Sequence, residues 1–441
     1  MFCQEGNMDK NLSKFLDNYT KNQTFRGHMP GHKGKSLLAG LECAYAWDIT
    51  EIQGADSLFE AEGILHQAEQ LTAEVYHIPA TCWSAGGSTL CIQAMLAQMK
   101  AENRTIIAGR TVHRSFLNSC ILLDLEVKWV YPKSGGIISG NYALADFEKA
   151  LQEAEKPSAV YVTSPDYLGN MQDIQGLAKL CEKYHARLLV DNAHGAHLAF
   201  LKENLHPIAL GADYCCDSAH KTLPALTGGA FLQMKDASKA GSMKQHMQMF
   251  GSTSPSYLIM QSLELCTEWL SREGKFKIQT CEKRIQTLKQ KFSQKYCFIG
   301  KEPYHLTISA NGTKLAEDLR NCAVPVECEY ADKTCIVILL SPVMEEKEFQ
   351  ILESALEICK PYPAEEIPEL PLPMEQAVSL REAGLASFEQ IPLEKAEHRI
   401  CASVQVPCPP AVPIAVSGER LTKEWLQLMK FYGLKQIAVI N

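Results

Sequence analysis

Long hydrophobic runs are missing from this 441-residue sequence. Its best apolar run, residues 335–340, has the length of a β-strand and falls far below the roughly 18 residues of a membrane-spanning helix. The N-terminus lacks a basic segment followed by an apolar stretch, so we expect no secretory signal. Basic residues are outnumbered, with 43 Lys and Arg against 51 Asp and Glu, for a formal net charge of −8. These absences argue against a membrane span and a broad basic face for nucleic acid, but they allow a small anionic ligand in a local site.

Cysteine pairs with metal-binding or redox spacing are absent as well. The 17 cysteines are odd in number, are scattered along the chain and never form a Cys-x-x-Cys motif. Several fall in apolar runs, as Cys215 and Cys216 do. This pattern indicates buried free thiols in a reducing compartment, not a disulfide framework or a cysteine zinc site. We therefore expect a cytoplasmic protein.

Short apolar segments alternate with helical patterns between residues 58 and 234. We expect helices over residues 65–76, 90–99 and 174–184, and strands over residues 105–108, 127–131, 159–162, 187–190, 212–216 and 229–234. Such alternation predicts an α/β fold with a mostly parallel sheet covered by helices on both faces. Ligands bind beyond the carboxyl ends of the strands in sheets of this kind.

A second group of predicted strands and helices begins after a long predicted helix over residues 257–292. Strands are expected over residues 306–309 and 334–340, and helices over residues 315–322 and 345–358, followed by a proline-rich stretch. We divide the chain into an N-terminal segment (1–25), a large ligand-binding domain (26–265), a small α/β domain (266–365) and a C-terminal proline-rich segment that packs on the site (366–441).

Three features of the large domain together indicate one kind of chemistry. One predicted strand ends on Asp191, and another is followed by Lys221. The run Ser84-Ala-Gly-Gly-Ser-Thr89 precedes a helix and suits an anion such as phosphate. Pyridoxal phosphate chemistry needs a lysine that forms a Schiff base and a carboxylate that keeps the pyridine nitrogen protonated. His113, which follows a strand, could stack on the cofactor ring, although a structural histidine is the alternative.

Two other motifs are weaker. Gly34-Lys35-Ser36 resembles the end of a P-loop, but the glycine required six positions before the lysine is Met29. Asp191, His194 and His197 suggest a metal site, yet the His-Glu-x-x-His pattern is absent and no further ligand is apparent. We therefore predict no metal.

The order of motifs resembles the ornithine/lysine/arginine decarboxylases, which are pyridoxal phosphate enzymes of the aspartate aminotransferase fold (fold type I). The resemblance runs from about residue 26 to 420 and is carried by Pro30-Gly-His-Lys-Gly34, Asp48-Ile-Thr-Glu51, Gly54-Ala-Asp56, Gly87-Ser-Thr89, His113-Arg-Ser115, Ser164-Pro-Asp-Tyr-Leu-Gly169, Asp191-Asn-Ala-His-Gly195, Ser218-Ala-His-Lys-Thr222, Ser252-Thr-Ser-Pro-Ser-Tyr257 and Gly418-Glu419. The chain is similar to the short bacterial form, which lacks an N-terminal wing domain.

The resemblance implies a role for each matching residue. Lys221 corresponds to the Schiff-base lysine, Asp191 to the partner of the pyridine nitrogen and His113 to the residue on the ring. The remaining cofactor contacts implied are Gly87, Ser88, Thr89, Ser218, His220, Ser252 and Thr253, the last two reaching the phosphate of a neighbouring subunit. A homodimer or larger assembly is therefore implied. Candidates for the acid that binds the second cation of the substrate are Asp48, Glu51, Asp56 and Glu419.

Several positions depart from the family pattern. Asn192 stands in place of Glu and Arg114 in place of Lys. The anion-binding cradle, Gly86-Gly-Ser-Thr89, begins with a glycine in place of Asn. The usual Tyr-Pro-Pro-Gly-Ile-Pro motif reads Cys408-Pro-Pro-Ala-Val-Pro413 here, which affects the substrate side. We expect decarboxylation of arginine, lysine or ornithine to the amine, as in polyamine biosynthesis, with arginine favoured by analogy with other short members.

Two alternatives remain open from the sequence. One is another fold-type-I activity, either an aldolase or an aminotransferase, which usually carries a carboxylate-binding arginine late in the small domain. Arg399 and Arg420 lie late in the chain but in no recognised context. The other is a catalytically silent homologue that acts as a binding dimer.

Overall fold

A seven-stranded sheet forms the centre of the fold. The computed structural model describes residues 11–403 and 410–441. Its strand order is β1-β7-β6-β5-β4-β2-β3, and β7 runs antiparallel to both of its neighbours while the remaining pairs are parallel. The strands are β1 (Ala80–Ser84), β2 (Thr105–Gly109), β3 (Val127–Val130), β4 (Ser158–Thr163), β5 (Arg187–Asp191), β6 (Tyr214–Asp217) and β7 (Ala230–Met234). The predicted mostly parallel sheet is confirmed.

Alternate residues of the central strands enter two different hydrophobic cores, because successive side chains of a strand point to opposite faces. Val160 and Val162 of β4 pack in one core, whereas Ala159 and Tyr161 pack in the other. The first core also receives α3 (Ile64–Tyr76), α6 (Leu144–Gln152), α7 (Ile174–Lys183) and α10 (Tyr257–Trp269). The second receives α4 (Gly87–Ala101), α5 (Arg114–Leu123) and α9 (Ala240–Phe250). Burial on both faces explains why the strands are apolar throughout.

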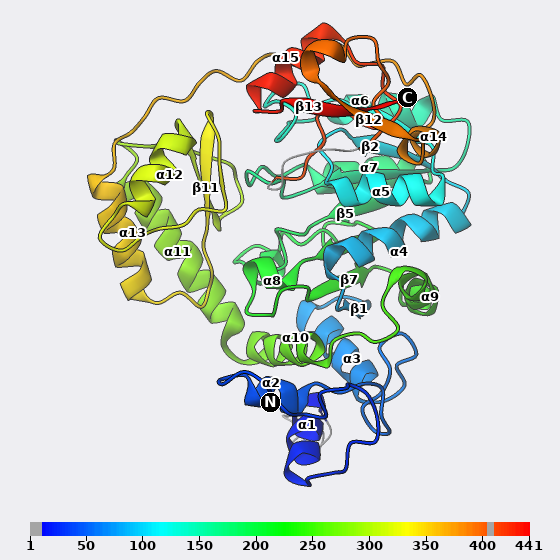
Figure 1. Cartoon of the computed structure of the whole chain (residues 1–441), viewed down its shortest axis with the longest axis vertical. Coiled ribbons are helices and arrows are strands. Elements are labelled where there is room, and N and C mark those ends of the chain that lie inside the picture. Colours follow the sequence, from blue (N-terminus) through cyan, green and yellow to red (C-terminus); the bar gives the residue numbers. More distant parts are fainter. Residues whose placement is uncertain (1–10, 404–409) are drawn as a thin grey trace.

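A smaller antiparallel sheet lies at the far end of a long helical connector (Figure 1). The connector consists of α10, a π-helical turn (Leu270–Gly274) and α11 (Lys275–Lys291), so the predicted helix over residues 257–292 is confirmed with one irregular turn. The sheet has the order β10-β11-β9-β8 and comprises β8 (Cys297–Ile299), β9 (His305–Ser309), β10 (Tyr330–Ala331) and β11 (Cys335–Leu339). Two helices accompany it, α12 (Gly312–Arg320) and α13 (Glu346–Ile358).

The C-terminal part of the chain returns to the large sheet. Figure 1 shows the segment after α13 crossing from the small sheet to α14 (Leu380–Gly384). A two-stranded sheet of β12 (Phe388–Pro392) and β13 (Gln436–Ile440) and helix α15 (Lys423–Phe431) complete this part. Leu380 packs in the same core as α4 and α5. Arg110, fully buried after β2, donates to the carbonyl oxygens of Pro413 (2.8 Å) and Ile414 (3.0 Å) and pairs with Glu419 (3.4 Å).

The N-terminal segment is held against α10. Helix α1 (Leu12–Lys21) begins at Asn11, whose side chain caps it, and Glu264 of α10 accepts the backbone N–H groups of Leu12 and Ser13, both at 2.8 Å. Helix α2 (Glu42–Trp47) follows in an exposed stretch. Within the described residues, no helix is both long and apolar enough to cross a membrane.

The structure adds elements that the sequence pattern did not indicate. Strand β1 was not expected, because Ala80-Thr-Cys-Trp-Ser84 is short and mixed in polarity; it pairs only with β7 at the edge of the sheet. Helix α4 begins at Gly87, three residues before the expected start. The 3₁₀ turns Leu198–Phe200, Ala237–Lys239 and Leu393–Lys395 were also not expected.

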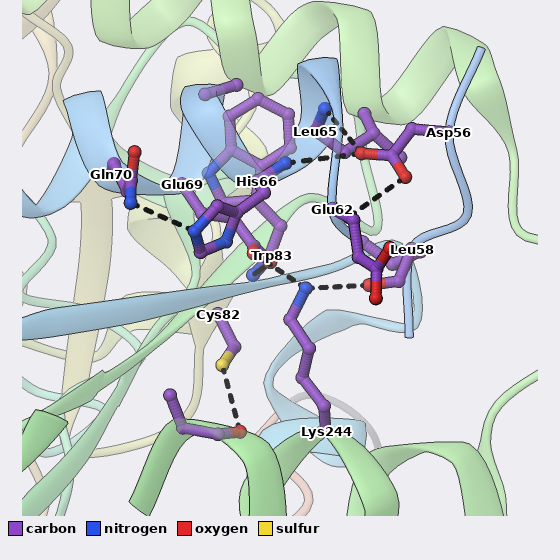
Figure 2. Close-up of polar contacts among 12 residues, drawn as sticks. Asp56, Leu58, Glu62, Leu65, His66, Glu69, Gln70, Cys82, Trp83 and Lys244 are labelled. Carbon is purple, nitrogen blue, oxygen red and sulfur yellow. Dashed lines mark hydrogen bonds and ion pairs between the residues drawn. The ribbon is translucent and has the colours of Figure 1, made fainter. Parts of the chain in front are cut away.

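A buried ion pair joins α3, β1 and α9 (Figure 2). Glu69 is 3% exposed, and its Oε2 lies 2.6 Å from Nζ of Lys244. Its Oε1 accepts the backbone N–H of Trp83 (2.9 Å), while Lys244 also donates to the carbonyl oxygen of Leu58 (2.9 Å). Burial raises the pKa of Glu69 to about 7 even though Lys244 favours the charged form. The folded protein therefore holds a proton on Glu69 at pH values where the unfolded chain releases it.

We expect Glu69→Gln to flatten the dependence of stability on pH. Because the pKa of Glu69 is raised on folding, its contribution is fully present below pH 4.5 and is lost as the pH rises through about 7. The wild type should therefore lose on the order of 2 kcal/mol relative to the glutamine variant between pH 5 and pH 8. Urea unfolding at both pH values measures this. The exposed Glu62→Gln should follow the wild type, and a pH-independent difference for Glu69→Gln would contradict the assignment.

Candidate active site

The carboxyl ends of β5 and β6 bring Asp191 and Lys221 to one edge of the large sheet. Asp191 is the last residue of β5 and is paired in register with Cys216 of the adjacent parallel strand β6. Strand β6 ends at Asp217, and the one-turn helix α8 (Ala219–Thr222) then presents Lys221. The expectation that these two residues lie at neighbouring strand ends is met by the topology.

Asp191 is a buried carboxylate with few strong donors around it. It is 2% exposed; its Oδ1 accepts from the N–H of Ala193 (3.2 Å) and the thiol of Cys216 (3.5 Å), and its Oδ2 accepts from the hydroxyl of Tyr161 (3.4 Å). A buried charge needs a close opposite charge or several good hydrogen bonds. These donors are neutral and distant, so the carboxylate suits a cationic partner such as a protonated pyridine nitrogen.

His113 lies at the start of α5, close enough to Asp191 and Lys221 for their charges to act on it. It is the N-cap of that helix, and its Nδ1 lies 2.8 Å from the hydroxyl of Ser115. Burial lowers the pKa of His113 to about 4, and the positive charges of Lys221 and Arg114 add to this effect while Asp191 opposes it. The ring is therefore neutral at neutral pH and can present a flat face to a flat cofactor.

The cradle lies at the N-terminus of α4. Gly87 has a left-handed backbone (φ +67°), and an added Cβ would point into open space. The hydroxyl of Ser88 is hydrogen-bonded to that of Ser218, which ties the helix terminus to the turn before Lys221. Thr89 is exposed. A 15-residue helix that begins with small residues beside open space fits a phosphate.

The other predicted cofactor contacts lie around this cradle. Nδ1 of His220 is 3.0 Å from the carbonyl oxygen of Gly229, which fixes its ring. Ser252 is exposed and lines a pocket of about 140 Å³ together with Gly86 of the cradle, and Thr253 is the next exposed residue. The roles of these residues remain predictions.

The four acidic candidates for the substrate's second cation have different surroundings in the structure. Oδ2 of Asp48 lies 3.0 Å from Nε2 of His32, and Glu51 is exposed. Asp56 accepts backbone N–H groups at the start of α3, including that of Leu65 (3.0 Å; Figure 2). Glu419 is 1% exposed and is paired with Arg110. Their roles also stay predictions.

A line of side chains that the sequence did not indicate extends from Lys221. Nε2 of His194 lies 3.0 Å from Nζ of Lys221, and its Nδ1 lies 3.1 Å from Nε2 of His305. Nδ1 of His305 contacts Glu302, whose other oxygen lies 2.6 Å from Nε2 of His197. His194 and His197, paired in sequence as possible metal ligands, thus face different partners. His305 belongs to β9 of the small sheet and Glu302 to the bend that precedes β9, so no local spacing pointed to them.

The departures from the family pattern have partly visible causes. Nδ2 of Asn192 donates to Oδ1 of Asp217 (2.6 Å), where a glutamate would bring two buried carboxylates together. Ala411 has a left-handed backbone (φ +54°), the conformation that glycine adopts without strain, and its carbonyl oxygen accepts the N–H of Arg114 (2.9 Å). Cys408 lies outside the described residues.

The two late arginines are engaged away from the site. Arg399 donates to Glu389 and to the carbonyl oxygen of Ile440, both at 2.8 Å. Arg420 donates to Glu375 at 2.9 Å.

Comparison with known proteins identifies the family. Residues 11–314 match the major domain of the Orn/Lys/Arg decarboxylases, and residues 367–437 match their C-terminal domain. An arginine decarboxylase of Bacillus subtilis is 27% identical over 93% of this chain and 90% of its own length, and one of Bacillus anthracis is 27% identical over 94% and 91%.

Solved structures share the fold. The lysine decarboxylase of Francisella novicida superposes with a TM-score of 0.81 at 16% identity, over 98% of this chain and 81% of its own. The serine palmitoyltransferase of Sphingomonas wittichii superposes with a TM-score of 0.57 at 15% identity, over 69% and 79%. Another serine palmitoyltransferase structure, determined with pyridoxal phosphate, has a TM-score of 0.55. The chain belongs to the Orn/Lys/Arg decarboxylase family and is a fold-type-I, pyridoxal phosphate-dependent decarboxylase.

Proposed function

We propose that the protein converts a basic amino acid, with arginine favoured, into its amine and carbon dioxide. The observation that carries this proposal is the buried Asp191 at the end of β5, next to the strand that presents Lys221. The names of the relatives that match most of the chain support arginine. The net charge of −8 also suits a cationic substrate and product.

Each of the chain's own residues has a separate role in such a site. Pyridoxal phosphate, when bound, withdraws electrons from the carbon that loses its carboxylate. Asp191 would hold the protonated nitrogen of the bound cofactor, because the donors around its carboxylate are a neutral amide, thiol and hydroxyl. His113 would cover one face of the bound cofactor ring and exclude water from that face. Ser88, Ser218 and the terminus of α4 orient the phosphate. Lys221 would form the covalent link to the cofactor through Nζ, which lies 3.0 Å from Nε2 of His194.

We further propose that the enzyme is a homodimer or a larger assembly in the cytoplasm. Large apolar side chains are exposed in the stretch between α1 and α2, including Phe25 (92%) and Leu37 (94%). The 15 cysteines among the described residues are all free thiols, which supports a reducing compartment. Light scattering of the purified protein should give at least twice the 49.0 kDa chain mass; a mass of one chain would contradict the assembly.

A substrate assay tests the activity directly. Purified protein supplied with pyridoxal phosphate is incubated separately with arginine, lysine and ornithine, and released carbon dioxide, amine and keto acid are measured. We expect carbon dioxide and amine in equal amounts, with kcat/KM for arginine at least tenfold above the other two, a difference of about 1.4 kcal/mol. Keto acid in place of carbon dioxide would indicate an aminotransferase. A preference for lysine or ornithine would overturn the choice of substrate but not the reaction.

A further inference from the structure

A continuous line of polar side chains runs from Lys221 into the small domain. The links are Lys221 to His194 (3.0 Å), His194 to His305 (3.1 Å) and His305 to Glu302. Glu302 and His305 are fully buried and His194 is 4% exposed. His194 follows β5 of the large sheet, whereas His305 opens β9 of the small sheet. The line therefore crosses between the two domains.

The two ends of this line fix the direction of its hydrogen bonds. A lysine ammonium can only donate, and a carboxylate can only accept. Burial, followed by the positive charge of Lys221, holds the pKa of His194 well below its ordinary value, so this imidazole is neutral. Its Nε2 then accepts from Lys221 and its Nδ1 donates to His305. His305 completes the line through its Nδ1, which contacts the carboxylate of Glu302.

The surroundings of Glu302, at the buried end of the line, favour its charged form. It accepts the backbone N–H groups of Tyr304 (3.0 Å) and His305 (2.7 Å), and both of its oxygens face imidazoles. Burial raises the pKa of Glu302, but His305 and His197 more than offset this, and the pKa lies well below its ordinary value. The carboxylate is thus a fixed acceptor for Nδ1 of His305.

We propose that Glu302 and His305 are positioning residues that lock His194 as a hydrogen-bond acceptor and thereby hold Lys221 protonated and oriented whenever it is not bound to the cofactor. Lys221 must leave the cofactor when the substrate binds, and a fixed acceptor keeps its amine in one place with a proton available. The small domain thereby contributes to the chemistry through His194, without touching the substrate. The inference rests on the cofactor chemistry and holds for any of the three substrates.

The capture of pyridoxal phosphate by the cofactor-free full-length protein tests this inference. Only the unprotonated lysine reacts, so the pH midpoint of the rate of visible absorbance growth reports the pKa of Lys221. His305→Asn keeps an amide N–H near the position of Nδ1 for Glu302 but removes the acceptor for His194. His194 can then adopt the other tautomer, which donates to the amine. We expect the midpoint to fall by about one pH unit, the scale of losing a hydrogen bond to a charged group.

A matched control uses the other imidazole on the same carboxylate. His197→Gln keeps an amide N–H near the position of Nε2, which faces Glu302, and leaves the line to Lys221 intact. Its midpoint should equal that of the wild type. The other charged or titratable groups in the electrostatic surroundings of Lys221 are Asp191, His113, Arg114 and His220. All four remain in both variants.

A further variant tests whether a shift in His305→Asn comes from a folding defect. His194→Asn cuts the line next to Lys221 while leaving Glu302 and His305 in place, and its midpoint should also fall. An unchanged midpoint in either cut variant, or an equal shift in His197→Gln, would overturn the inference. Because the readout is cofactor capture, a wrong choice of substrate would leave these results unchanged, and the decarboxylation assay fails or succeeds independently.

Discussion

Replacing Lys221 with alanine is expected to abolish decarboxylation and the visible absorbance that the protein shows with bound pyridoxal phosphate. Lys221 stands on α8 at the carboxyl end of β6, next to the strand that ends on Asp191. Alanine cannot form the covalent link, and the hydrogen bond to His194 disappears with the amine. We expect activity to fall by at least about ten-thousandfold, as when a covalent nucleophile is removed.

The measurement is the absorbance spectrum together with carbon dioxide release. Lys235→Ala is a suitable control, because Lys235 is exposed just after β7 and away from the carboxyl ends of the parallel strands. That control should keep both the band and the activity. A Lys221→Ala protein that retains more than about 1% of wild-type turnover would show that another group carries the reaction.

Asp191→Asn should produce the second largest loss. Asparagine preserves the shape of the side chain but removes the negative charge that a protonated ring nitrogen requires. The surroundings supply no substitute, because the groups that contact Asp191 are an amide, a thiol and a hydroxyl. We expect kcat to fall on the order of a thousandfold, the scale of losing a preorganised electrostatic partner. The phosphate contacts persist, so part of the cofactor should stay bound.

Steady-state kinetics and cofactor content distinguish this effect from simple instability. Asp213→Asn is a control from the opposite end of the same strand pair, where Asp213 binds Arg187 at 2.9 Å. We expect it to lower the melting temperature without a comparable change in kcat. Near wild-type turnover in Asp191→Asn would refute the electrostatic role of Asp191.

The sequence was sufficient for the parts of the site that lie on one sheet. Asp191 ends an apolar strand, Lys221 and His113 each follow one, and parallel strands place their carboxyl ends at one edge. Strand periodicity therefore predicted both the fold and the position of these residues. The helical connector and two of the four strands of the smaller sheet, β9 and β11, followed from the same patterns, whereas the short β8 and β10 did not.

The remaining parts depend on contacts between distant segments. His305 reaches His194 across 111 positions in the chain, so no spacing rule could join them. The acidic candidates were chosen by charge and motif, but the pairing of Glu419 with Arg110 is set by the return of the C-terminal part to the large sheet. Strand β1 escaped notice because an edge strand of mixed polarity shows no clear alternation.

The burial of Arg110 has a consequence for the order in which the chain can mature on the ribosome. Arg110 is synthesised 309 residues before Glu419, and its other acceptors, Pro413 and Ile414, also come from the end of the chain. At typical rates of translation this interval lasts from about 15 seconds to about a minute. During that time the guanidinium, three residues before His113, has to remain hydrated. In nascent chains, the surroundings of Arg110 in the large domain should therefore stay unpacked until the last residues emerge.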